Sequence, residues 1–254
     1  MPPISPAERA METSFRSTSL GLSAWCIVAA FGTYFCMYAF RKPFTAAPYS
    51  GVLSVGIGYK TALVASRVLG YMASKFLGIT IVSKAEGRNR VSLLLGLIAF
   101  AEFSLVMFGL TSPPYNLVWM FCNGLPLGMV FGLVLGFLEG RRQTEILAAG
   151  LCTSFIVADG VTKSVGASLL EGGVPEHWMP AAAGGLFLLP ILGFTWMLTK
   201  IPRPSHADVS ARSERAPMNG EERLAFFRRY SVGVTLIVLT YLLITVLRSI
   251  RADF

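Results

Sequence analysis

The stretch TYFCMYAFR (residues 33–41) has a near-copy, TYLLITVLR (residues 240–248), toward the other end of the chain. Each begins with Thr-Tyr and ends with an arginine, and the sequence around each is apolar. Placing an arginine at the centre of a membrane helix costs about 2.5–3.5 kcal/mol on insertion scales, so such a residue is a functional-site hypothesis by default. This near-repeat predicts a protein with two related halves that face one site.

The composition sets the class of protein. Of the 254 residues 54% are hydrophobic and only 14% are charged, whereas a soluble domain carries about 25% charged residues. The apolar runs are continuous rather than alternating, which is typical of membrane helices and not of barrel strands. The sequence therefore predicts an all-α membrane protein.

Seven apolar runs organise the chain, each close to the roughly 20 residues that a membrane span needs. We expect the first to kink at Pro43, and the basic piece 221–230 to lie on the inner leaflet as a short amphipathic segment. The runs are residues 21–49, 60–82, 91–110, 115–138, 146–169, 180–199 and 231–250. They predict a cytoplasmic tail (1–20), a six-helix bundle (21–199), a basic cytoplasmic loop (200–230) and a seventh helix (231–254) that starts a missing C-terminal six-helix bundle.

Lysine and arginine in the connections predict the orientation. Basic residues gather at 84–90, 141–142 and 200–229, while 111–114 and 170–179 contain none. By the positive-inside rule the N terminus and the basic connections are cytoplasmic. Arg41 and Lys42 then fall at an external connection, where they break the pattern, and this favours an intramembrane role for Arg41 over simple snorkelling.

Two cationic segments predict an anion site. Tyr34, Tyr38 and Arg41 share one helix face, and a guanidinium beside hydroxyl groups suits a phosphate or carboxylate. Arg248 has the same context in the seventh run. The alternative is that these arginines are structural and bind backbone carbonyls or an acidic side chain.

The second run carries a basic stripe within roughly 80° of arc. Its members are Lys60, Arg67, Tyr71 and Lys75. The stripe either lines an anion path or is neutralised inside the bundle, where Glu102, Glu139 and Asp159 are the candidate partners.

Asp159 and Lys163 are four residues apart, so they fall on one helix face and can pair with each other. In the other interpretation Asp159 is a proton-coupling group or a partner for Arg41 or Arg67.

Glycines recur every fourth residue in the fourth run, at Gly124, Gly128, Gly132 and Gly136. The spacing predicts a groove for close helix packing, not chemistry. The four cysteines and two histidines lack metal-type spacing, so we expect no metal and no cofactor, and we interpret His177 and His206 as surface residues of loops. We expect no enzyme activity, and the net charge of +8 reflects membrane topology rather than a nucleic-acid partner.

Together these features resemble the major facilitator superfamily. The stretch from Gly78 to Arg90 (GITIVSKAEGRNR) is similar to a degenerate form of its signature loop between helices two and three, although the usual aspartate is missing. The resemblance implies a transporter that alternates access to a central site and lies in the cytoplasmic membrane of a bacterium among membrane lipids.

Local strings are most similar to the organophosphate:phosphate antiporters of that superfamily. The strings are Arg41-Lys42-Pro43-Phe44, Tyr71-Met72-Ala73-Ser74-Lys75-Phe76 and Val246-Leu247-Arg248. This resemblance implies that Arg41 and Arg248 grip a phosphate with Lys42 and Lys75 nearby. The helix-five histidine of those antiporters is absent, and Asp159 falls near its place. The chain is also similar to an uncharacterised bacterial group of membrane proteins.

The sequence thus predicts a truncated secondary transporter for a small anionic organic solute, phosphorylated molecules included. The fragment itself is expected not to transport. The alternative is a membrane sensor on the same fold that binds an anion without moving it.

Overall fold

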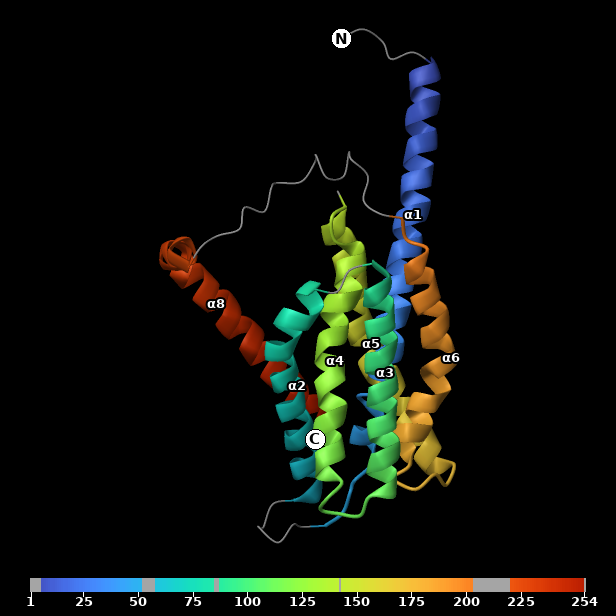
Figure 1. The fold of residues 1–254 in the computed structure, drawn as a ribbon, viewed down its shortest axis with the longest axis vertical. Coiled ribbons are helices and arrows are strands. Elements are labelled where there is room, and N and C mark those ends of the chain that lie inside the picture. Colours follow the sequence, from blue (N-terminus) through green and yellow to red (C-terminus); the bar gives the residue numbers. More distant parts are fainter. Residues whose placement is uncertain (1–5, 52–57, 85–86, 142, 203–219, 254) are drawn as a thin grey trace. The chain divides into compact units, whose positions relative to one another are not determined.

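The computed structural model describes residues 6–51, 58–84, 87–141, 143–202 and 220–253, without the side chains of residues 6–20, 79–80, 83–84 and 87–88 and of parts of the last helix. These ranges are helical almost throughout (Figure 1). The elements are α1 (Pro6–Tyr38), the 3-10 helix η1 (Pro43–Ala46), α2 (Tyr59–Lys84), α3 (Gly87–Leu110), α4 (Leu117–Leu138), α5 (Thr144–Glu171), α6 (Met179–Thr199) and α8 (Gly220–Asp253). They fall into two compact units, residues 1–209 and 210–254, and α8 belongs to the second.

Five of the described helices contain segments long and apolar enough to cross a membrane. The segments are Gly21–Tyr38 in α1, Asn89–Leu110 in α3, and the whole of α4, α5 and α6. A helix about 20 residues long spans the hydrocarbon core. The chain is therefore an all-α, multi-pass membrane protein.

α2 differs from the other helices of the bundle in polarity rather than in length. It has 26 residues, yet it is not among the five apolar spans. The reason lies in its sequence, because Lys60, Arg67 and Lys75 fall within it. A helix of this kind needs protein or water beside its cationic face.

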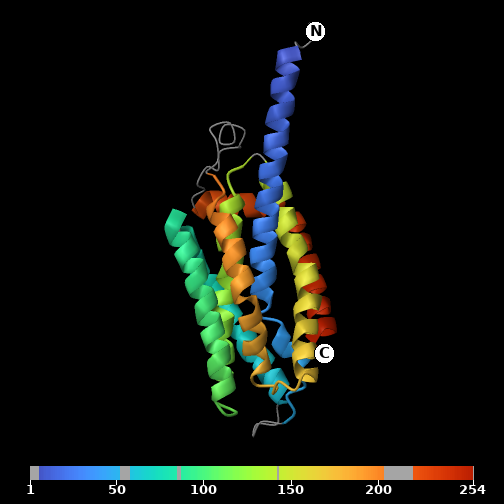
Figure 2. The same cartoon turned by 90° about the vertical axis from the view of Figure 1, so that its right-hand side faces the viewer.

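Within the first unit, α1 and α4 form the centre. α1 packs against α4, α5 and α6, while α4 lies between α2 and α3 (Figures 1 and 2). The core between them is built from aliphatic and aromatic side chains, with Met37, Ile98 and Leu133 among those that are fully buried. Because lipid is as apolar as these side chains, close packing and not hydrophobic transfer holds such helices together.

The glycines of α4 lie where other helices approach it closely. A Cβ atom built on Gly124 would lie 2.3 Å from the carbonyl oxygen of Arg67, and one on Gly128 would lie 2.4 Å from the hydroxyl oxygen of Ser74. Gly132 faces Val82 of α2 and Gly136 faces Arg90 of α3. Small residues at these positions let the backbones of neighbouring helices come together.

The end of the first helix differs from the expected kink at Pro43. α1 stops at Tyr38, and the amides of residues 39–41 donate to carbonyls three residues back at 3.0–3.1 Å. Such bonds tighten the last turn into a 3-10 geometry. Pro43 has no N–H with which to continue the helix, and it instead begins η1. Arg41 and Lys42 therefore lie in a turn between two helices and not inside a helix.

Two further boundaries differ from the sequence interpretation. α1 begins at Pro6, inside the segment expected to be a tail. α8 begins at Gly220 and so includes residues 221–230; their position on the inner leaflet stays a prediction. α8 has 34 residues and is longer than the seventh apolar run. Backbone hydrogen bonds define a helix, so polar residues can extend it beyond its apolar part.

Candidate functional site: a cationic cluster at the α1–η1 turn

Arg41 is held in the turn that follows α1. Its amide donates to the carbonyl of Tyr38 at 3.0 Å. Its guanidinium carbon lies 5.5 Å from the ring centroid of Tyr38 and 5.0 Å from that of Tyr71. Among the side chains that the structure describes, the guanidinium makes these ring contacts but no hydrogen bond or ion pair. Arg41 as a whole residue is partly exposed, and its N–H donors are not used by the described side chains.

Lys75 of α2 joins Arg41 at the same aromatic ring. Its ammonium nitrogen lies 4.6 Å from the ring centroid of Tyr71 and donates to the carbonyl of Gly128 at 3.3 Å. The Gly128 carbonyl belongs to α4, so Lys75 bridges the two closely packed helices. Two cations over one ring share a favourable cation–π environment, yet they repel each other unless an anion lies between them.

Lys42 is buried and paired. Its ammonium nitrogen lies 3.4 Å from a carboxylate oxygen of Asp159 on α5, and the two side chains are 7% and 22% exposed. Arg41 also interacts electrostatically with Asp159. The sequence left Asp159 with three possible partners, namely Lys163, Arg41 and Arg67; the structure adds Lys42, which is distant from it in sequence. Lys163 lies one helical turn farther along α5.

Arg67 supports the backbone of the turn. It is buried, its guanidinium carbon lies 4.1 Å from the centroid of the Phe44 ring, and it donates a hydrogen bond to the carbonyl oxygen of Arg41. Lys60 acts in a similar way, because its ammonium group donates to the carbonyl of Thr45 at 3.0 Å. These two members of the basic stripe thus hold the backbone that presents Arg41.

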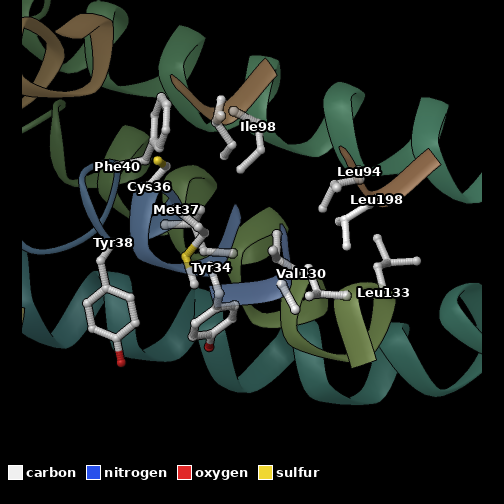
Figure 3. Close-up of a cluster of buried hydrophobic side chains, with 14 of the residues drawn as sticks. Tyr34, Cys36, Met37, Tyr38, Phe40, Leu94, Ile98, Val130, Leu133 and Leu198 are labelled. Carbon is white, nitrogen blue, oxygen red and sulfur yellow. The ribbon is translucent and has the colours of Figure 1, made fainter. Parts of the chain in front are cut away.

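Tyr34 and Tyr38 form an aromatic wall beside the cations. In Figure 3 both rings point away from Ile98 and Leu94. Tyr34 packs against Phe155 with ring centroids 4.8 Å apart, and against Tyr38 at 5.6 Å. The Tyr38 ring also lies beside Arg41, with its centroid 5.5 Å from the guanidinium carbon. Rigid rings of this kind fix the positions of the few polar groups in a binding site.

The loop after η1 is fastened at the opposite end of the first unit from the basic connections. The amide of Tyr49 donates to a carboxylate oxygen of Glu176 at 3.1 Å, and its hydroxyl group donates to the backbone carbonyl of Glu176 at 3.0 Å. Burial, and then the Glu176 carboxylate, raise the pKa of the Tyr49 phenol above its ordinary value. The phenol therefore keeps its proton, and its hydrogen bond, throughout the neutral pH range.

His177 belongs to the same cluster and is not the surface residue that the sequence suggested. Its ring stacks on Phe108 with centroids 5.7 Å apart, and it meets Tyr49 edge-on at 5.8 Å. His206 lies outside the described residues. The position of His177 next to Glu176 in a short connection gave no sign of this packing, because the rings that cover it come from distant segments.

Several sequence-predicted site residues therefore come together. They are Tyr34, Tyr38, Arg41, Lys42, Arg67, Lys75 and Asp159. Sequence reasoning missed the pairing of Lys42 with Asp159 and the contact of Phe44 with Arg67. Arg248 lies in the second unit, and its side chain is outside the described residues. No group of three metal-binding side chains occurs within the described ranges.

The comparisons with known proteins place the chain in a family without giving it an activity. No curated protein and no solved structure matches the chain. Residues 43–254 match the sequence profile described as "Family of unknown function (DUF5690)", and they include η1, α2 and the residues of the cationic cluster from Phe44 onward. This match extends over most of the chain, and the protein belongs to the DUF5690 family.

Proposed function

We propose that this membrane protein is part of a secondary transporter for a small anionic organic solute, phosphorylated molecules included. The observation that carries the proposal is the state of Arg41. The residue is partly exposed, and its guanidinium lies over the rings of Tyr38 and Tyr71 without a hydrogen bond or ion pair among the described side chains. A cation inside a membrane protein is costly and marks a ligand or ion pathway.

The chemistry around Arg41 favours an anion with two or more oxygens. A guanidinium forms paired N–H···O bonds with phosphate or carboxylate. Lys75 lies over the same Tyr71 ring, and Lys42 is the next residue in the turn. Asp159 is the acidic side chain that the structure pairs with this cluster. Cationic groups thus outnumber acidic ones there, so the electrostatic potential attracts anions.

Transport, as opposed to simple binding, is supported by the resemblance to the major facilitator superfamily and by the sequence echo at Arg248. In this proposal the second half of a transporter presents Arg248 to the same anion, and the two halves rock around it. The orientation follows from the positive-inside rule, with the N terminus in the cytoplasm of a bacterial cell.

The test compares anion binding by the protein in lipid nanodiscs before and after Arg41→Lys. Calorimetry is carried out with inorganic phosphate, glycerol phosphate and succinate. Lysine keeps the positive charge but lacks the paired N–H donors of the guanidinium. We therefore expect phosphate-type ligands to bind at least about tenfold more weakly, which corresponds to loss of one charge-assisted hydrogen bond.

The matched control is Arg90→Lys. Arg90 also rests on an aromatic ring, with its guanidinium carbon 5.4 Å from the Phe137 centroid, and it lies at the beginning of α3 away from the turn. We expect this variant to bind like the wild type. Equal binding by the wild type and Arg41→Lys contradicts the proposal. The natural protein can also be reconstituted in proteoliposomes. Anion binding without anion flux there is the result expected of a sensor.

A further inference from the structure

We propose that the solute bound at Arg41 carries an aromatic ring next to its anionic group. The ring packs against an aromatic patch, which consists of the side chains of Tyr34, Tyr38, Phe131 and Phe155, while the guanidinium binds the anionic group. The inference rests on the proposed function, because it names the class of solute for the same site. Aryl phosphates and aromatic carboxylates are therefore expected, rather than phosphorylated glycerol or sugars.

The aromatic patch joins rings from α1, α4 and α5. Phe155 of α5 is its centre, with its ring centroid 4.8 Å from that of Tyr34, 5.6 Å from that of Phe131 and 6.4 Å from that of Tyr38. Tyr34 also meets Phe131 edge-on at 5.7 Å. Rings at such separations attract one another in offset-stacked and edge-to-face pairs. A further ring can be added to this set in the same way.

The aromatic patch reaches the guanidinium of Arg41 through Tyr38. The Tyr38 ring is nearly parallel to that of Phe155, with an angle of 23° between them, and its centroid lies 5.5 Å from the guanidinium carbon. The rings of Tyr34 and Tyr38 project from α1 on the same side (Figure 3). An anionic group bound to Arg41 therefore has the aromatic patch beside it, within reach of a ring attached to that group.

The outer rings of the aromatic patch are incompletely covered. Tyr34 and Tyr38 are buried, whereas Phe131 and Phe155 are partly exposed. Arg41 lies beside them, and a cationic side chain that faces lipid is costly. The uncovered side of the patch therefore faces water or protein, where a solute can be received. Aromatic walls with a few polar groups that set the orientation are typical of ligand sites.

Several polar side chains on the helices of the aromatic patch are already engaged with backbone carbonyls. On α4, the amide nitrogen of Asn123 donates to the carbonyls of Phe40 and Ala101 at 3.2 and 3.1 Å. On α5, the hydroxyl groups of Ser154 and Thr162 donate to carbonyls of their own helix at 2.6 Å. A solute with many hydroxyl groups loses binding energy where these groups find no partner. An aromatic ring needs no such partners.

The experiment compares three phosphate monoesters by calorimetry with the protein in lipid nanodiscs. They are phenyl phosphate, cyclohexyl phosphate and glycerol phosphate, studied above neutral pH so that each phosphate is mainly a dianion. The ligands share the group that Arg41 binds and differ in the group attached to it. We expect phenyl phosphate to bind about tenfold more tightly than glycerol phosphate, and more tightly than cyclohexyl phosphate, whose ring has no π face.

Variants of the aromatic patch test whether its rings cause the preference. Phe155→Leu should reduce the preference for phenyl over glycerol phosphate to about threefold or less, and unchanged glycerol phosphate binding shows that the variant is folded. If Phe155→Leu does not fold, Phe131→Leu removes an outer ring instead and should also lower the preference. The matched control is Phe187→Leu on α6. Its ring is also partly buried and lies 6.2 Å from that of Phe35, and we expect the preference of the wild type.

The outcomes separate this inference from the proposed function. Glycerol or cyclohexyl phosphate that binds the wild type as tightly as phenyl phosphate overturns the inference. A preference that persists in the folded variants of Phe155 and Phe131 does so too. If Arg41→Lys still weakens the binding of all three ligands, the anion site stands in either case. Binding that is absent for all three, or unaffected by Arg41→Lys, overturns the proposed function itself.

Discussion

Arg67 and Arg41 are arginines with opposite surroundings. Arg67 is buried against Phe44 and donates to the carbonyl of Arg41, whereas Arg41 is partly exposed, lies over two tyrosine rings and makes no hydrogen bond among the side chains described. The first arrangement is that of a structural arginine, and the second is that of an arginine which can receive a ligand. The sequence placed both in one cationic set because it could not show where each side chain finds its partners.

This contrast predicts that Arg67→Gln lowers the stability of the protein more than it lowers its affinity for anions. Glutamine removes the ring contact and leaves the Arg41 carbonyl with a weaker partner or none. We expect a loss of about 1–3 kcal/mol in the free energy of unfolding, measured by denaturant titration in detergent. Arg41→Gln should cost less stability and more anion affinity. Equal stability losses in the two variants would contradict the division of roles.

At the scale of residues, the sequence singled out positions whose signal is local. The turn residues Arg41 and Lys42 stood out because they interrupt an apolar run at a connection that should lack basic residues. The partner of Lys42 did not stand out, because the pairing with Asp159 joins the turn to α5. A one-helix rule such as the four-residue spacing of Asp159 and Lys163 describes only contacts within a helix.

At the scale of elements, the fit of α2 against α4 determines where Lys75 lies. The two helices approach through Gly124 and Gly128, and Lys75 then reaches the carbonyl of Gly128 at 3.3 Å. The regular spacing of the glycines made a packing face predictable. It did not show that α2, the helix with the basic stripe, would be the one that packs there.

The close approach predicts the effect of Gly124→Ala. The added Cβ would lie 2.3 Å from the Arg67 carbonyl oxygen and 2.9 Å from the Tyr71 amide nitrogen. Both atoms belong to the backbone, so α2 must move, and we expect a loss of about 1–3 kcal/mol in stability. Gly96→Ala is the control, because a Cβ there meets nothing within 4 Å; it should be neutral or slightly stabilising. An equal loss in both variants would contradict helix packing as the role of Gly124.

The end of α1 could not be predicted from the hydropathy pattern. Hydropathy continues past Tyr38, so an apolar run alone predicts one long kinked helix. The backbone instead tightens over residues 39–41 and restarts at Pro43. Hydrogen-bond geometry and the missing proline N–H decide this boundary, and neither is visible in a hydropathy profile.

For the whole molecule, the prediction concerns orientation. In a variant with the four cysteines replaced by alanine, Ser112→Cys lies in the exposed connection between α3 and α4, and Lys200→Cys lies at the exposed end of α6. The α3–α4 connection and the end of α6 lie at opposite ends of the bundle (Figure 1). We expect a membrane-impermeant maleimide added to intact cells to label Ser112→Cys, while Lys200→Cys is labelled only after the cells are opened. The reverse pattern would contradict a cytoplasmic N terminus.

The class and the helix pattern of the molecule follow from its sequence for a simple reason. In lipid every backbone N–H and C=O group must be satisfied within a helix or a closed barrel, so long apolar runs leave little choice. The chemistry of the cluster does not follow in the same way. Arg41, Lys75 and Asp159 lie on three different elements, and the packing of the bundle brings them together.

The central claim is that the guanidinium of Arg41 grips an anion. The most direct measurement is the distance between the phosphorus of bound phosphate and the guanidinium nitrogens of Arg41, by solid-state NMR of the protein in lipid with isotopically labelled arginine. Arg41→Lys assigns the signal. We predict a separation within about 4 Å, as hydrogen-bonded N–H···O geometry requires. Bound phosphate that shows no coupling to Arg41, or couples to another arginine in its place, would contradict the account.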